Sequence, residues 1–129
     1  MFFPFRRATF LIPSGPDEDL SRKHLFVVLT DPFAREGKKV REVLLVSFSS
    51  LRMHHDPSCI LKPGDHPFFH HDSFVDYSRA RIEEAAKLSQ FQQREPVTEE
   101  VFKKICQGLE SSPHTTPKIL AFYKEASSL

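Results

Sequence analysis

The chain has 129 residues, of which 40% are hydrophobic and 27% charged, and its 18 basic and 17 acidic side chains leave a formal net charge of +1. This length and composition are typical of one folded domain, which excludes a disordered or low-complexity chain. The net charge is much lower than that of a typical strongly basic nucleic-acid-binding domain, and the apolar runs are too short for a membrane span. Two cysteines without a CxxC spacing and an N-terminus without a long apolar stretch predict a cytoplasmic protein with no membrane contact.

Short strands are expected through the first two thirds of the chain. The run at 25–30 is continuously apolar, and 40–48 contains a second such run, so both are expected to be buried strands that pair as a hairpin. Proline, glycine and charged residues separate these runs and mark the turns. Five strands are predicted in all, at 9–12, 25–30, 40–48, 58–61 and 73–81.

From residue 82 the composition changes to good helix formers. Glu83 and Lys87 are spaced as an i,i+4 ion pair, so a helix is predicted to begin there. Thr98 is a predicted N-cap with two glutamates in the first turn behind it, and Thr116 is another, with proline at the first helical position.

Strands followed by helices predict an α+β fold. The chain is therefore expected to form one domain over 1–129. A small antiparallel barrel or curled sheet should occupy 5–82, and a helical tail at 83–129 should pack on it.

Five of the seven histidines lie between positions 54 and 71, together with aspartates and Cys59. These are metal-ligand types, but their spacing matches no familiar zinc pattern. Imidazoles also suit acid–base chemistry, because their unperturbed pKa lies near neutrality, and a third interpretation is a set of loop histidines that only hydrogen-bond turns. His66 is the candidate for proton transfer, since its turn directly precedes the pair Phe68 and Phe69, which should anchor it in the core.

A second candidate lies where a polar loop enters the sheet. Arg22, Lys23 and His24 open the strand at 25–30, so two cations and an imidazole are adjacent there. They suit the placement of a phosphate beside a general acid or base, although routine charges at an exposed strand end explain them slightly better. Ser49 is one of three serines that end the next strand. Neither a serine-hydrolase elbow nor a nucleotide-binding glycine pattern occurs in the sequence.

Tyr77, Arg79 and Arg81 alternate along the last predicted strand, so they are expected to share one face of the sheet. An aromatic ring beside two guanidinium groups is a plausible surface for RNA, because bases stack on rings and arginines contact phosphates. Charged residues on the solvent side of an edge strand explain the pattern about as well.

The strand plan, together with the segments 23–30, 44–50 and 72–82, resembles the PemK/MazF family of toxins from bacterial toxin–antitoxin systems over roughly residues 6–82. The resemblance implies an SH3-like β-barrel that cleaves single-stranded RNA without a metal or other cofactor, as a homodimer whose groove is blocked by an antitoxin protein. The family's arginine-proline opening of the second strand appears here as His24-Leu25, and its threonine after the third strand falls on Ser49.

The expected activity is therefore an endoribonuclease in which a ribose 2′-hydroxyl attacks the adjacent phosphate. His24 and His66 are the candidates for proton transfer, and Ser49 is the candidate for a catalytic hydrogen bond. Phosphate and RNA contacts are assigned to Arg22, Lys23, Tyr77 and Arg79. The alternative is a non-catalytic binding module of the same fold, which holds a peptide or a protein partner in its groove.

The homodimer is also expected from the apolar stripes of the predicted helices at 98–109 and 116–126. Each stripe is too small for an independent core, so the helices must lie on the barrel or across a partner's barrel. The alternative is a monomer whose own tail covers the sheet edge.

Overall fold

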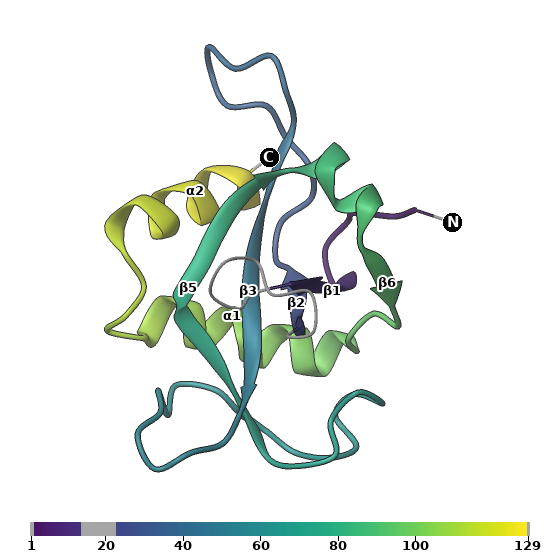
Figure 1. The fold of residues 1–129 in the computed structure, drawn as a ribbon. Coiled ribbons are helices and arrows are strands. Elements are labelled where there is room, and N and C mark those ends of the chain that lie inside the picture. The colour runs from purple at the N-terminus through teal and green to yellow at the C-terminus, as the bar shows by residue number, and fades with distance from the viewer. Residues whose placement is uncertain (1, 14–22, 129) are drawn as a thin grey trace.

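The computed structural model describes residues 2–13 and 23–128, and its architecture is α+β, as predicted (Figure 1). A curled sheet of six antiparallel strands has the order β4-β5-β3-β2-β1-β6, and two helices follow it in the chain. The strands are β1 (Thr9–Pro13), β2 (Lys23–Val28), β3 (Glu42–Ser50), β4 (Ile60–Leu61), β5 (Ser73–Glu84) and β6 (Gln92–Arg94). The helices are the 3-10 helix η2 (Ala85–Gln90), α1 (Glu99–Ser111) and α2 (Pro117–Ser127).

Both faces of the central strands are buried, which explains why β2 and β3 have continuous apolar sequences. On one face, Leu25, Val27 and Leu44 belong to the larger core, to which α1 and α2 also contribute. On the other face, Phe26 and Val28 belong to a smaller core closed by η2. The apolar stripes of both helices are thus buried against the sheet of their own chain.

Both predicted helix caps are confirmed. The Thr98 hydroxyl accepts a hydrogen bond from the backbone N–H of Val101 at 3.2 Å, and that of Thr116 accepts one from Ile119 at 3.3 Å. Each cap satisfies a backbone N–H that has no partner within the helix. None of the helices in the described residues has the length and apolar character needed to cross a membrane.

The helix predicted from residue 82 is wrong. β5 continues to Glu84 in register with β3, where Val43 pairs with Glu83, and a 3-10 helix and the unpredicted strand β6 follow. Glu83 and Lys87 still approach to 3.9 Å, but not on an α-helix. Pairing with a distant strand outweighs the local helix propensity. The sheet therefore extends to Arg94, beyond the predicted barrel limit at residue 82.

A β-bulge interrupts the pairing of β3 with β5. Leu45 pairs with Arg81 and Ser47 with Asp76, so Val46 alone lies opposite residues 77–80. The extra residues change which side chains face the same way, because alternation holds only in an uninterrupted strand. This bulge decides where the residues of β5 that were expected to contact RNA are placed.

Candidate functional site

The start of β2, the end of β3 and the loop before β5 enclose a pocket of about 330 Å³, which we call the strand-end pocket. β2 and β3 are antiparallel, so the first residues of one lie beside the last residues of the other. The pocket is lined by Lys23, His24, Leu25, Phe48, Ser49, Ser50, Phe68, Phe69, His70, His71 and Ser73. Three residues that the sequence assigned to one site, Lys23, His24 and Ser49, are thus brought together.

The polar groups of this pocket differ in exposure. Lys23 and the pair His70 and His71 are exposed, His24 is half-buried, and Ser49 is 8% exposed. An ammonium group, three imidazoles and three serine hydroxyls, that of Ser49 among them, therefore line one cavity. Imidazoles can accept and donate protons, and the ammonium can stabilise negative charge that develops on a bound phosphate. Arg22, assigned to the same phosphate, lies outside the described residues.

The loop that carries the histidine pair is fixed by aromatic packing. Phe69 is 7% exposed, belongs to the larger core and lies with its ring centroid 5.0 Å from that of Phe48. Phe68 is half-buried against the same core, under the guanidinium of Arg94. The expectation that these two phenylalanines anchor the loop is confirmed, and the anchor fixes the backbone from which His70 projects.

His66 occupies a structural position and does not line the strand-end pocket. It is 3% exposed, and its Nε2–H donates to the Glu95 carbonyl at 2.5 Å while Nδ1 accepts from the Phe68 backbone N–H at 3.1 Å. Both ring nitrogens are therefore used by backbone groups. A buried imidazole with both nitrogens engaged is unsuited to proton transfer, so the role expected for His66 does not fit its position. It instead ties the loop to the segment before α1.

Tyr77 is also placed differently from the expectation. It is 1% exposed, and its hydroxyl donates to the carbonyl of Ile105 in α1 at 2.6 Å, while burial raises its pKa. Because of the β-bulge, Tyr77 faces the larger core, whereas Arg81 lies on the other face with its guanidinium 4.9 Å from the Phe26 ring centroid. The three-residue RNA face predicted on β5 is therefore not formed. Arg79 remains exposed, 3.5 Å from Asp76.

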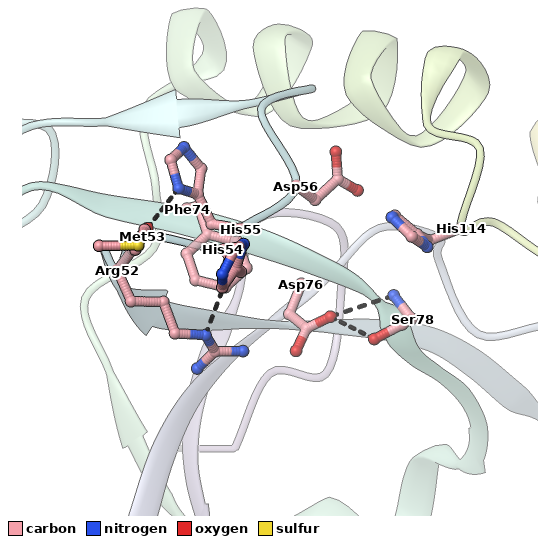
Figure 2. A pocket seen from close by; sticks show the side chains of 9 residues that line it. All are labelled: Arg52, Met53, His54, His55, Asp56, Phe74, Asp76, Ser78 and His114. Carbon is pink, nitrogen blue, oxygen red and sulfur yellow. Dashed lines mark hydrogen bonds between the residues drawn. The ribbon is translucent and has the colours of Figure 1, made fainter.

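A second cavity, of about 430 Å³, adjoins β5, and we call it the Phe74 pocket (Figure 2). It lies between the loop after β3, the first half of β5 and the connection from α1 to α2. Its lining comprises Arg52, Met53, His54, His55, Asp56, Phe74, Asp76, Ser78 and His114. This grouping was not predicted from the sequence, because its members come from three separate segments, 52–56, 74–78 and the connection that carries His114, which only the fold brings together.

Asp56 fastens the wall of the Phe74 pocket to the end of α1. One carboxylate oxygen accepts from the backbone N–H and the hydroxyl of Ser58, and the other accepts from the hydroxyl of Ser112 at 2.5 Å. Burial alone would raise the pKa of Asp56, but the hydrogen bonds from Ser112 and Ser58 outweigh it and lower the pKa below its ordinary value. The carboxylate is thus held ionised as a structural tie.

Replacing Asp56 with asparagine should lower the free energy of unfolding by about 1–3 kcal/mol at pH 7, because donors aimed at a carboxylate lose their charged partner. Since the pKa is lowered by folding, this stabilisation is present above the pKa of the unfolded state and is lost as the pH falls through that of the folded state. Urea unfolding should therefore show that the difference in free energy of unfolding between the wild type and Asp56→Asn decreases as the pH falls from 7 to 3. Asp72→Asn, at an exposed position, is the control. A gap that is constant with pH would contradict this account.

The metal interpretation of the histidine cluster finds no support in the described part of the chain, where no three His, Cys, Asp or Glu side chains are arranged to hold an ion. Cys59 is buried, and burial raises the pKa of its thiol to about 11, so it is not poised as a thiolate ligand. The histidines instead separate into two pockets and one structural position.

His70 and His71 line the strand-end pocket although they were not predicted as site residues from the sequence. The available signal was their position directly after two phenylalanines that fix the loop in the core. No protein-family model and no curated protein sequence matches this chain.

Proposed function

We propose that this protein is a metal-independent endoribonuclease that cleaves single-stranded RNA in the strand-end pocket. The observation that supports this most is the grouping of Lys23, His24, Ser49 and the pair His70 and His71 around one cavity. Cleavage through the ribose 2′-hydroxyl needs a base, an acid and a cation near the phosphate, and this cavity offers side chains suited to all three.

In the proposed reaction, one imidazole takes the proton of the ribose 2′-hydroxyl. The 2′-oxygen at the same time forms a bond to the adjacent phosphorus. The bond from phosphorus to the 5′-oxygen breaks, and a second, protonated imidazole gives its proton to that leaving oxygen. His24 and one residue of the His70–His71 pair approach from different elements and are the candidates for these roles. Lys23 and the Ser49 hydroxyl stabilise the charge on the non-bridging oxygens. The products are a 2′,3′-cyclic phosphate and a free 5′-hydroxyl.

The proposal includes membership of the PemK/MazF family, with an SH3-like barrel, action on cytoplasmic RNA, a homodimer and an antitoxin partner. The curled antiparallel sheet agrees with such a barrel. The RNA substrate, the homodimer and the antitoxin partner are proposed from the chain's resemblance to the family. The non-catalytic module of the same fold is the competing proposal, and it predicts binding of a peptide or protein in the groove without loss of RNA.

The test uses the purified full chain and end-labelled single-stranded RNA of mixed sequence, with EDTA present. We expect cleavage that leaves 2′,3′-cyclic phosphate ends, and no cleavage of the same sequence carrying 2′-O-methyl groups. Lys23→Ala should slow cleavage by roughly 10- to 1,000-fold, because one positive charge next to the phosphate is removed. Lys38→Ala is the matched control, since Lys38 is also an exposed lysine, in the loop between β2 and β3.

Intact RNA across many sequences, with and without EDTA, would reject the enzyme and leave the binding module. Cleavage that both lysine variants retain in full would keep the enzyme but remove Lys23 from the site. Equal loss in the two variants would indicate a general effect of charge rather than a contact in the pocket.

A further inference from the structure

The two pockets are neighbours on the sheet. Ser49, which lines the strand-end pocket, is the cross-strand partner of Phe74, and such partners point to the same face with their Cβ atoms about 5 Å apart. Ser73 and Phe74 are also consecutive in β5, and each lines a different pocket. An RNA strand whose phosphate lies against Ser49 therefore has the Phe74 pocket within reach of an adjacent nucleotide.

The wall of the Phe74 pocket carries a layered stacking surface. The Arg52 guanidinium lies 5.1 Å from the centroid of the buried Phe74 ring, and the His55 ring lies 5.7 Å from it. Arg52 is exposed, and its Nε donates to the His54 carbonyl at 3.2 Å (Figure 2). RNA bases stack on guanidinium planes as well as on aromatic rings. The cavity, at about 430 Å³, lies within the size range of small-ligand sites.

Beside this surface lies a carboxylate, which can only accept hydrogen bonds. Asp76 is 7% exposed, and its Oδ1 accepts from the backbone N–H and the hydroxyl of Ser78. Its Oδ2 lies 3.5 Å from the Arg79 guanidinium, in an ion pair that retains acceptor capacity. A base that places N–H groups toward this carboxylate is favoured. Guanine can offer two parallel donors, adenine and cytosine offer an amino group, and uracil offers a single N–H between two carbonyls that a carboxylate repels.

We propose that the Phe74 pocket is a nucleobase subsite that stacks one base of the RNA on Arg52 and selects an amino-bearing base, guanine foremost, through Asp76. This rests on the proposed function, since it assigns the specificity of the same RNA-binding site. Arg79, at the rim, contributes positive charge toward the RNA backbone without reading the base.

The test measures binding separately from cleavage, with fluorescein-labelled 2′-O-methyl hexamers that contain uracil at every position or a single guanine among uracils. Such oligonucleotides lack the attacking hydroxyl. Fluorescence anisotropy on the full chain should give about 5- to 100-fold tighter binding of the guanine-containing hexamer, in the range of one bidentate base contact. Asp76→Asn should reduce this preference to within about threefold, because its amide oxygen can keep the Ser78 contacts while the amide nitrogen replaces Oδ2.

Arg79→Gln removes the ion pair but leaves the carboxylate, so it should weaken both hexamers by the same factor and leave their ratio unchanged. Arg52→Ala should weaken both as well, since it removes the stacking surface. Equal binding of the two hexamers by the wild type, or a preference that survives Asp76→Asn, overturns the subsite. In that case, cleavage of RNA by the wild type would still support the proposed endoribonuclease. Guanine-selective binding without cleavage rejects the enzyme and retains the subsite.

Discussion

Replacing His70 and His71 together with alanine is expected to lower the rate of RNA cleavage by about 10²- to 10⁴-fold, because a proton-transfer group is removed from the strand-end pocket. Both side chains are exposed, so the melting temperature should stay close to that of the wild type. His24→Ala should give a loss of similar size. Initial rates on end-labelled single-stranded RNA, with circular dichroism of each variant, measure both quantities. Full activity of both the double variant and His24→Ala would contradict the assignment.

Replacing His66 should affect the stability of the protein far more than its rate of RNA cleavage. His66→Ala leaves the Glu95 carbonyl and the Phe68 N–H without partners, so it should cost about 2–4 kcal/mol of stability, which combines lost hydrogen bonds with a cavity. The molecules that remain folded at low temperature should cleave RNA at a rate within about tenfold of the wild type, less than the loss expected for a general acid or base. A loss of 10²-fold or more per folded molecule would restore the catalytic role that the sequence suggested for His66.

The parts of the fold that the sequence predicted well are those set by local signals. The buried runs in β2 and β3 could be recognised because both faces of these strands are covered. The starts of α1 and α2 could be placed because Thr98 and Thr116 are followed by residues that favour a first helical turn. The segment 82–94 could not, because its structure depends on pairing with β3 and β1, far away in the chain.

The same division applies to the candidate sites. Lys23, His24 and Ser49 were grouped through the resemblance to the PemK/MazF family, and the antiparallel pairing of β2 with β3 places the start of one strand beside the end of the other. Tyr77 was misplaced because a β-bulge leaves no clear mark in the sequence, and one bulge inverts the alternation beyond it. The Phe74 pocket was missed because Arg52, Asp76 and His114 belong to segments whose proximity is a product of the fold.

Replacing Gly108 with alanine is expected to destabilise the protein although alanine is the better helix former. A Cβ at this position of α1 would overlap the Tyr77 hydroxyl and lie 2.9 Å from Tyr77 Cζ and 3.0 Å from the Cβ of Cys59. Overpacking costs about 1–3 kcal/mol, and displacing the hydroxyl from the Ile105 carbonyl costs about 1–3 kcal/mol more. Together these exceed the gain of about 1 kcal/mol in helix propensity. Urea unfolding should therefore show a net loss of about 1–5 kcal/mol.

A double-mutant cycle of Gly108→Ala with Tyr77→Phe tests whether overlap with the Tyr77 hydroxyl causes the loss of stability. Tyr77→Phe removes the hydroxyl that a Cβ at Gly108 would strike, so adding Gly108→Ala to it should cost less than it costs in the wild type, a coupling of about 0.5–3 kcal/mol. Rescue should be incomplete, because Tyr77 Cζ and the Cβ of Cys59 stay close. Gln107→Ala, at the exposed neighbouring position, controls for helix propensity and should be neutral or slightly stabilising. Equal costs of Gly108→Ala in both backgrounds would mean that the contact between α1 and β5 at Tyr77 is not what requires glycine.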